Sequence, residues 1–501
     1  MSRLLPLPVV VPLLGAALTL VLGRWPRLQR AISVTGLSTT LVVAAVLLVQ
    51  AYRHGPVVLA VGAWPPPVGI VLVADQLAAL MLVVSSAVTL CVLLYSIGQR
   101  QAEIGENAPV TIYHPTYLVL TAGVTNAFLA GDLFNLFVAF EILLAASFVL
   151  ITLGGTEVRI RTGSTYVVVS ILSSMVFLAA VGLVYAATGT LNMAQLAQRL
   201  DALPEGVRLA LQVALLLAFG VKAAVFPLSA WLPDSYPTAP APVTAVFAGL
   251  LTKVGVYAVI RTETLLFPGG QVSRLLMVVA GLTMLVGILG AVAQSDMKRL
   301  FSFTLVSHIG YMIFGVALST VAGLAGAIFY VVHHITIQTT LFLVAGLVEL
   351  RAGSTDLRRL GGLARMAPLL GVLFFVPAMN LAGVPPFSGF LGKLGLLQAG
   401  VTAGGALPLA LVAAGTLTSL LTLYVASRVW NIAFWREPRL ATEEPAVRLP
   451  ATMVGATVAL IVLGLALTVA AGPLFDVTAD AATDLRDRTP YIRAVFPGGT
   501  P

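Results

Sequence analysis

Residues 222–246 read KAAVFPLSAWLPDSYPTAPAPVTAV. Lys222 closes a long apolar run here, and prolines follow it at short intervals: Pro227, Pro233, Pro237, Pro240 and Pro242. Proline removes a backbone donor and clashes with the preceding helical turn. The stretch therefore predicts an apolar helix that breaks just after a lysine, with the break near 227–242.

The composition of the whole chain places this helix in a membrane. The chain has 501 residues, of which 59% are hydrophobic and 10% are charged, and its mean hydropathy is +1.01. A soluble domain carries about 25% charged residues, so this surface must face lipid. A membrane span takes about 20 apolar residues, and apolar runs of that length predict an all-α polytopic membrane protein with about fourteen transmembrane helices. We expect these helices near 4–22, 31–52, 70–97, 113–131, 133–153, 163–187, 207–227, 241–262, 273–294, 299–319, 321–348, 366–396, 406–434 and 450–472.

The net charge and the single cysteine exclude several classes of site. The formal charge is +8, but the basic residues are spread over short loops, so no nucleic-acid-binding face is expected. Cys91 is the single cysteine, which excludes a disulfide framework, a cysteine-built zinc site and an iron–sulfur cluster. We expect no metal and no cofactor.

The loop charges predict the orientation of the chain. With the N-terminus outside, the odd-numbered loops face the cytoplasm, and they hold Arg24, Arg27, Arg30, Arg100, Arg159, Arg161, Lys298, Arg299, Arg351, Arg358, Arg359, Arg365, Arg436, Arg439 and Arg448. The even-numbered loops hold fewer: Arg53, Arg199, Arg208, Arg261 and Arg274. This is the positive-inside bias. It predicts a multi-pass protein of a bacterial cell membrane with both termini outside.

Three of the four lysines lie inside apolar helices. Besides Lys222 these are Lys253 and Lys393, whereas Lys298 lies at a helix end. Arginine keeps its proton in proteins, but a desolvated lysine loses it readily. Among the acids, Glu141 is the most central, about 13 Å along its helix from Asp132 at 1.5 Å per residue. One interpretation is a set of structural ion pairs; but charges at the bilayer centre cost at least about 2.5 kcal/mol each, so the group favours a function.

A second break accompanies Lys393. Residues 378–397 read AMNLAGVPPFSGFLGKLGLL, with Pro385 and Pro386 ahead of the lysine, and we expect the break near 380–387. Irregular backbone at membrane depth is tolerated only inside protein or beside a water-filled cavity. For either break alone, an ordinary kink or re-entrant loop is the alternative.

Weak internal similarity links the two halves. Asp132-x-x-x-Leu136-Phe137 recurs as Asp296-x-x-x-Leu300-Phe301, an offset of 164 (296 − 132). On the predicted helices this is a step of five, and an odd step reverses the direction of the copy. The pattern predicts two inverted five-helix repeats, as found in transporters. We divide the chain into helices 1–3 (1–110), a first repeat (111–265), a second repeat (266–436), and helix 14 with a C-terminal tail (437–501).

Histidines supply titratable groups in the second half. His308 lies near the repeat counterpart of Glu141, and His333 and His334 lie in the next helix. A single intramembrane histidine often serves as a helix–helix hydrogen bond. Glutamate, lysine and histidine together at similar depth are typical of a proton relay.

The motifs KAAVFPLSAWLP, APVTAVFAGLLTKVGVYAVIR and SHIGYM, with the Glu141 helix, resemble the antiporter-like subunits shared by respiratory complex I and the Mrp multisubunit sodium/proton antiporters. The resemblance covers about 70–435 and implies fourteen helices with two inverted repeats. It implies a proton pathway with the following members: Glu141, Lys222, Lys253, His308, His334 and Lys393. In it Glu141 pairs with Lys222, and His333 belongs to a D-type histidine pair.

Within that family the chain is most similar to the D-type branch of Mrp antiporters. Complex I members usually carry PFHxWLPxAH after the seventh helix, whereas here Ser229 and Tyr236 stand in place of its two histidines. This implies a proton-translocating subunit, not an enzyme, with A-, B-, C-, E-, F- and G-type subunits as partners in the lipid bilayer and protons and sodium as the ions. A proton-pumping subunit of a complex I-type NADH:quinone oxidoreductase is the alternative, and a structural subunit with vestigial charges is a third. No spacing pattern identifies a sodium site.

Overall fold

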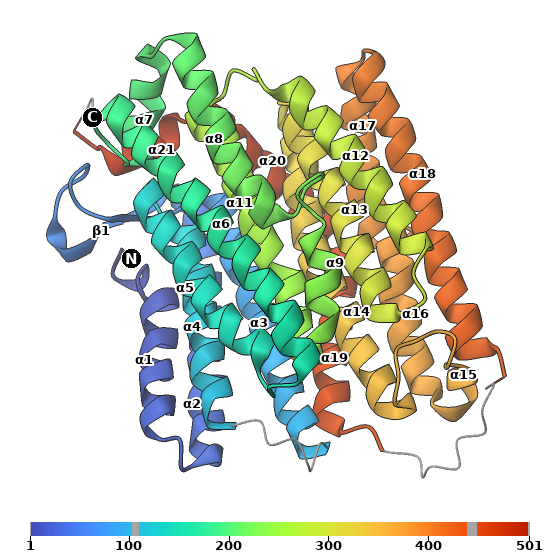
Figure 1. Ribbon diagram of the computed structural model, residues 1–501. Helices are drawn as coiled ribbons and strands as arrows, with labels where there is room; N and C mark the ends of the chain where they lie inside the picture. The colour runs from blue at the N-terminus through green and yellow to red at the C-terminus, as the bar shows by residue number, and fades with distance from the viewer. Residues whose placement is uncertain (1, 103–109, 438–447, 499–501) are drawn as a thin grey trace.

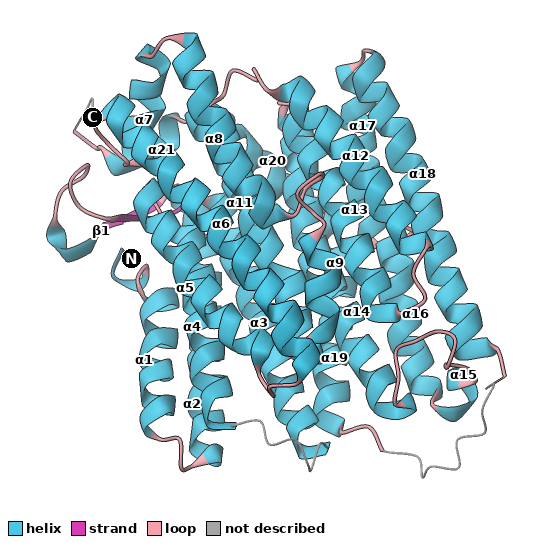
Figure 2. Cartoon of the chain, in the orientation of Figure 1, coloured by secondary structure: helices cyan, strands magenta, loops and turns pink. Residues whose placement is uncertain are grey.

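The computed structural model describes residues 2–102, 110–437 and 448–498. The described chain is a bundle of long helices that run roughly side by side, with one small hairpin at its edge (Figures 1 and 2). Helices dominate because a backbone in lipid must satisfy its hydrogen bonds within each segment. Arg439, one of the predicted cytoplasmic charges, lies outside the described residues.

The long helices follow the predicted spans. Their bounds are α1 Leu7–Val21, α2 Pro26–His54, α3 Gln76–Ala102, α4 Val110–Leu129, α5 Leu133–Thr152, α6 Glu157–Thr188, α8 Glu205–Ala223, α12 Ser273–Val292, α13 Met297–Ala317, α14 Val321–Ala352, α18 Ala406–Val429 and α19 Ala451–Val469. The eighth predicted span is built from α10 (Ala241–Val246), the π-helical segment η5 (Phe247–Leu251), α11 (Thr252–Arg261) and a second π-helical segment, η6 (Thr262–Leu266). The twelfth is split into α16 (Pro368–Ala382) and α17 (Ser388–Ala403).

Shorter elements complete the described chain. They are η1 Ser2–Leu4, β1 Val57–Ala60, η2 Val61–Ala63, β2 Val71–Ala74, α7 Met193–Arg199, η3 Leu200–Ala202, α9 Trp231–Ser235, η4 Tyr236–Thr238, α15 Leu363–Met366, η7 Trp430–Trp435, α20 Ala471–Asp487 and α21 Thr489–Val495.

The predicted membrane class and number of helices are confirmed. Twelve helices of the described chain are long and apolar enough to cross a membrane, by length and composition. The remaining two predicted spans correspond to α4 and to the broken pair α16–α17. Both predicted breaks are present, the first between α8 and α10 and the second between α16 and α17.

Three details of the prediction are wrong. Residues 71–74 form strand β2, not the start of the third helix, because they pair with β1 in antiparallel register, with Val57 opposite Ala74. The tail after the last predicted span at 450–472, for which no helix is predicted, is helical in α20 and α21. Arg261, expected in a loop, is 2% exposed at the end of α11.

The repeat is visible in two matching connections. Asp132 caps α5 by accepting from the Asn135 amide, and Asp296 caps α13 by accepting from the Arg299 amide. Each cap forms an isolated antiparallel bridge, Asp132 with Asn192 and Asp296 with Asp356. Both bridges shift by the same offset, 164 residues (296 − 132 and 356 − 192). One lies beside α7 and the other ahead of α15, at opposite ends of the bundle, as inverted repeats require (Figure 1).

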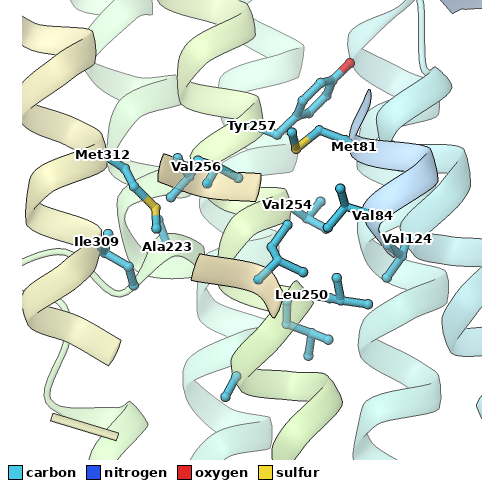
Figure 3. Close-up of a cluster of buried hydrophobic side chains, with 14 of the residues drawn as sticks. Met81, Val84, Val124, Ala223, Leu250, Val254, Val256, Tyr257, Ile309 and Met312 are labelled. Carbon is cyan, nitrogen blue, oxygen red and sulfur yellow. The ribbon is translucent and has the colours of Figure 1, made fainter. Parts of the chain in front are cut away.

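Small and apolar side chains pack around α11. Figure 3 shows Leu250 and Val254 facing Met81, Val84 and Val124, while other side chains of the same cluster, Ala223, Ile309 and Met312, lie toward α8 and α13. These residues are all buried. Since α11 also carries Lys253, the central lysine is held in a closely packed apolar surrounding.

Candidate functional site

Glu141 and Lys222 lie on neighbouring helices but do not form a close ion pair. The Lys222 amine donates to the Ser174 hydroxyl of α6 at 3.2 Å and lies 4.8 Å from the centre of the Phe140 ring. Glu141 is half-buried, and its Oε1 has no hydrogen-bond partner among the described residues. The two groups are within Coulombic reach of one another. The structure therefore shows Lys222 turned to a neutral partner, with Glu141 nearby and not engaged.

A small cavity adjoins Lys222. Its volume is about 30 Å³, and the residues that line it include Lys222, Ser170, Ser173, Trp231 and Tyr236. A cavity needs about 10–15 Å³ of such volume to hold a water molecule, so this space has room for at least one. The cavity lies beside the break that follows α8.

Lys253 is fully buried at the first turn of α11. Its amine donates to the Ala248 carbonyl at 2.5 Å, within the π-helical segment η5. A π-helical turn interrupts the regular i→i−4 pattern and is frequent at functional sites. Lys253 is thus bound to the backbone, with no carboxylate within ion-pair distance in the described chain.

A glycine lets α11 approach α8 at the level of both lysines. A Cβ added at Gly255 would lie 2.7 Å from the Ala223 amide nitrogen and 3.0 Å from the Lys222 carbonyl carbon. The first distance is shorter than real Cβ atoms show and the second is at the limit, and both neighbours are backbone, so glycine is needed there. The close approach brings the backbones that carry Lys222 and Lys253 into direct contact.

The histidines of α13 and α14 form one buried group with a tyrosine. The His308 and His334 rings are 5.3 Å apart, and the Tyr330 hydroxyl lies 2.7 Å from His308 Nδ1. His308 Nε2 lies 3.3 Å from the Thr422 hydroxyl. Both ring nitrogens of His334 lack a hydrogen-bond partner among the described residues, and Lys253 is within Coulombic reach of this ring. His334 is therefore the ring that lies between Lys253 and His308.

Lys393 lies across the second break. Its amine donates to the carbonyls of Leu381 and Ala382, the last two residues of α16, at 2.9 and 3.0 Å. Those carbonyls belong to the unsatisfied last turn of a helix, so Lys393 of α17 closes the end of the preceding helix. Lys222 precedes its break and Lys393 follows its own, so the two lysines are not equivalent in detail.

His333 connects to the same break. Its Nδ1 lies 3.0 Å from the Ser388 hydroxyl, and Ser388 in turn donates to Asn380 Oδ1 at 3.3 Å. Its other ring nitrogen has no hydrogen-bond partner in the described chain. His333 thus lies between the histidine group and the broken helix of Lys393.

The structure brings the second-half residues together more closely than the first-half ones. His308, His333, His334 and Lys393 share one buried region, and Lys253 adjoins it through His334. Pro227 and Pro233 lie in the segment between α8 and α10, and Pro385 and Pro386 lie between α16 and α17. Sequence reasoning missed Ser174, Asn380 and Tyr330. Tyr330 was detectable, since residues three and four apart share a helix face and His333 and His334 follow it at that spacing.

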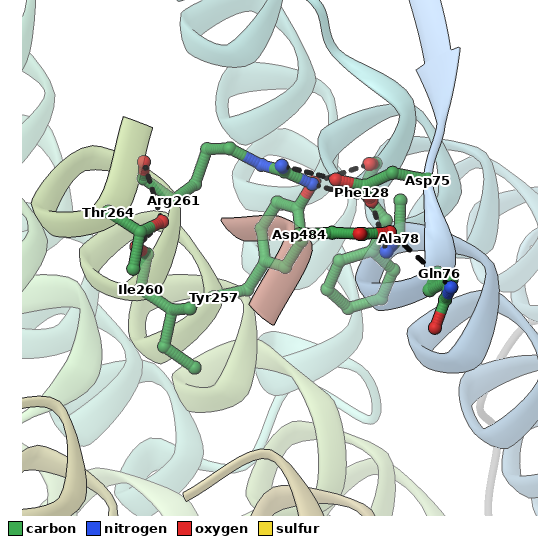
Figure 4. A network of polar contacts seen from close by, with 9 residues as sticks. All are labelled: Asp75, Gln76, Ala78, Phe128, Tyr257, Ile260, Arg261, Thr264 and Asp484. Atoms are coloured by element: carbon green, nitrogen blue, oxygen red, sulfur yellow. Dashed lines mark hydrogen bonds and ion pairs between the residues drawn. The ribbon is translucent and has the colours of Figure 1, made fainter. Parts of the chain in front are cut away.

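A second polar cluster lies where α3 begins and α11 ends. Arg261 donates to both oxygens of Asp75, at 2.5 and 2.8 Å, and to the Tyr257 hydroxyl at 3.1 Å. Figure 4 shows these contacts, with Asp484 of α20 reached through Gln76. Asp75 and Arg261 are 186 residues apart in the sequence, so no local sequence pattern predicts that they pair.

Comparisons with known proteins identify the family of the chain. A family model described as NADH:quinone oxidoreductase/Mrp antiporter, TM, matches residues 130–422. The D-type subunit of the Na(+)/H(+) antiporter from Alkalihalophilus pseudofirmus is 40% identical over 499 residues, which is 99% of this chain and 100% of that protein.

Solved structures share the fold. A chain of the Mrp complex from Dietzia sp. DQ12-45-1b superposes with a TM-score of 0.92 at 33% identity, covering 99% of this chain and 100% of that one. A chain of respiratory complex I from Thermus thermophilus gives a TM-score of 0.80 at 25% identity, covering 95% and 99%.

Proposed function

The chain belongs to the NADH:quinone oxidoreductase/Mrp antiporter family of membrane subunits, and we propose that it is the proton-translocating subunit of a multisubunit sodium/proton antiporter. In this proposal a buried relay couples proton uptake to sodium extrusion. Its members are Glu141, Lys222, Lys253, His308, His334 and Lys393, with His333 as a further member.

The observation that carries the proposal is the run of buried titratable groups from Lys253 through His334 and His308 toward Lys393. All four are at most 3% exposed. The lysines are bound to backbone carbonyls and the histidines to hydroxyls or to nothing in the described chain. Such partners leave the protons of these groups exchangeable, whereas a carboxylate partner would hold a lysine as its ammonium ion.

In this proposal the Glu141–Lys222 pair of the first half controls whether Lys222 holds a proton. An anion beside a lysine favours the ammonium form, and desolvation opposes it. When Lys222 turns from Ser174 to Glu141 it takes a proton, and when it turns back the proton is released toward Lys253. The cavity of about 30 Å³ beside Lys222 gives room for the water that delivers the proton.

The arrangement in the membrane is part of the proposal. Both termini lie outside, on the positive-inside bias of the loops. The repeats are 111–265 and 266–436, flanked by helices 1–3 in 1–110 and by helix 14 and the tail in 437–501; the matching bridges support this division. The partners are the A-, B-, C-, E-, F- and G-type subunits of such an antiporter.

The identity values support the antiporter over a complex I-type pump. The Dietzia Mrp chain is 33% identical with a TM-score of 0.92, against 25% and 0.80 for the Thermus thermophilus chain. The two functions predict different neighbouring genes. Small Mrp-type subunits would support the first, and NADH- or quinone-site subunits would contradict it.

Replacing Glu141 tests the relay. Glu141→Ala in the assembled complex should lower sodium-dependent proton exchange in membrane vesicles by at least about a hundredfold, the contribution of a proton-transfer group. Glu157→Ala, at an exposed glutamate at the start of α6, is the matched control and should retain exchange. Wild-type exchange by Glu141→Ala at normal abundance would exclude Glu141 from the relay.

A further inference from the structure

The two capping aspartates of the repeats occupy the same backbone position. The Leu133 amide donates to the Leu191 carbonyl, and the Met297 amide donates to the Thr355 carbonyl, at 2.9 and 3.0 Å. Reciprocal bonds run from Met193 to Gly131 and from Leu357 to Ser295, at 2.9 and 2.8 Å. Each aspartate uses its Oδ1 to accept the helix amide three residues on. The capping role is therefore the same in both.

The second carboxylate oxygen differs between the two. Asp296 Oδ2 accepts from the Thr355 hydroxyl at 2.5 Å. The residue in the first repeat that matches Thr355 is Leu191 (355 − 164), which has no donor in its side chain. Asp132 Oδ2 is buried with no hydrogen-bond partner in the described chain.

An oxygen of this kind is costly unless something binds it. Asp132 is 7% exposed, and a buried carboxylate oxygen without a donor requires either a proton or a water molecule. Either one makes the group competent to exchange a proton. Asp132 precedes the span Leu133–Thr152. Burial raises the pKa of its carboxyl to about 6, against the lowering effect of the backbone amides of Asn135, Val71 and Phe134.

The neighbouring ion pair of Asp75 and Arg261 cannot exchange a proton in this way. Asp75 binds Arg261 through both oxygens and also accepts the Ala78 amide, and arginine does not release its proton. Tyr491 of α21 is another titratable group near Asp132. The centre of its ring lies 5.2 Å from the Arg261 guanidinium, and its hydroxyl has no hydrogen-bond partner in the described chain.

The cluster stands at the end of the helix that carries Lys253. Arg261 lies eight residues beyond Lys253 on the α11–η6 span, about 12 Å at 1.5 Å per residue. Tyr257 lies one turn beyond Lys253, and its hydroxyl donates to the Phe128 carbonyl at 2.7 Å, near the end of α4. Two other acids lie near this end: Glu263 of η6 accepts from Gln212 through both oxygens, and Asp484 accepts from Gln76. Asp132 is thus an acid with an unpaired carboxylate oxygen at the end of the bundle toward which the Lys253 helix points.

We propose that Asp132, besides capping α5, is the proton-exchanging carboxyl at this membrane face, through which protons enter or leave the first repeat. This inference rests on the proposed proton relay and adds a terminal group to it. Asp296, its counterpart, caps α13 and accepts from Thr355, and it takes no part in proton exchange in this proposal.

Two substitutions at one position separate capping from proton exchange. Asparagine caps a helix as well as aspartate does, whereas glutamate is not among the preferred caps; only glutamate keeps a carboxyl. Proton exchange therefore predicts Asp132→Glu above Asp132→Asn, and capping alone predicts the reverse. The measurement is sodium-dependent proton exchange per assembled complex in membrane vesicles, with Asp296→Asn as the matched control.

We expect Asp132→Asn to lower the exchange rate by at least about tenfold. This is below the roughly hundredfold contribution of a typical proton-transfer group. Asp132→Glu should keep more, and Asp296→Asn should stay near wild type. The inference is overturned if Asp132→Asn exchanges like Asp296→Asn, or if Asp132→Glu falls below Asp132→Asn. Glu141→Ala is measured in the same series to keep the two proposals apart. If Glu141→Ala loses exchange while Asp132→Asn keeps it, only the role of Asp132 is refuted.

Discussion

The four lysines differ in their partners. Lys222 donates to a serine hydroxyl, and Lys253 and Lys393 donate to backbone carbonyls. Lys298, at the start of α13, forms an ion pair with Glu349 at 2.6 Å. The lysines inside the spans thus have neutral partners, and the one near the membrane face has a carboxylate. A neutral partner does not hold the proton as strongly, which is what a relay needs.

Arginine substitutions test whether a lysine must release its proton or needs only its charge. Lys222→Arg should be nearly as harmful to exchange as Lys222→Ala, because arginine keeps its charge and will not release the proton. Lys298→Arg should keep exchange, because its ion pair needs only the charge. The measurement is proton exchange per assembled complex. If Lys222→Arg exchanges as well as Lys298→Arg, Lys222 is a structural charge.

Lys393 allows a second substitution of this kind. Lys393→Glu should keep more proton exchange than Lys393→Ala, since a glutamic acid can pass a proton and, when neutral, can donate to one of the two α16 carbonyls. Lys393→Ala removes both donors and the titratable group. Equal loss of exchange in the two variants, in proportion to lost assembly, would show that Lys393 only closes the break.

At the scale of elements, the proposed path between the lysines depends on how closely the helices approach one another. Gly255 of α11 faces the backbone at Lys222 and Ala223, and a Cβ added at Gly249 of η5 would overlap the Thr339 hydroxyl of α14. The eighth span is therefore packed closely against both α8 and α14. On this span Lys253 donates to the Ala248 carbonyl of η5.

Gly255→Ala should separate α11 from α8. Overpacking of this kind costs about 1–3 kcal/mol of stability, and we expect a lower melting temperature together with reduced proton exchange. Gly182→Ala is the matched control, because a Cβ at that position of α6 meets nothing within 4 Å. A Gly255→Ala protein that melts and exchanges like Gly182→Ala would contradict the close contact.

At the scale of the whole molecule, the C-terminal helices bind the bundle together. Arg488 donates to the Ala197 carbonyl and to Asp201, both at 3.0 Å, and Arg486 donates to the Ser319 carbonyl. Tyr491 covers the Arg261 guanidinium. These contacts join segments of both repeats at the end where the C-terminus lies (Figure 1).

The proposed relay lies within this one chain, and its described residues show no cluster of metal-binding side chains for a second ion. No group of three or more histidine, cysteine, aspartate or glutamate residues suited to a metal ion occurs in the described part of the chain. The chain expressed alone should therefore insert into the membrane without catalysing sodium/proton exchange. Exchange by the purified single chain in proteoliposomes would contradict this expectation, and the assembled complex is the positive control.

The sequence by itself determined the membrane class, the number of helices and the positions of both breaks. These depend on local causes, namely apolar length, missing proline donors and the limited tolerance of the bilayer for charge. It also singled out Glu141, the buried lysines and the histidines as candidates, because titratable side chains in apolar runs are conspicuous. The offset of 164 predicted the repeat, and the two bridges share it.

Only the tertiary structure decided what each candidate touches. Ser174 in place of Glu141 as the partner of Lys222, the Asp75–Arg261 pair, and the free oxygen of Asp132 all depend on segments far apart in the chain. Side chains of similar type cannot reveal such partners, because packing and not local pattern selects among them. For the same reason β2, α20 and α21 were missed, since each is held in place by distant segments of the chain.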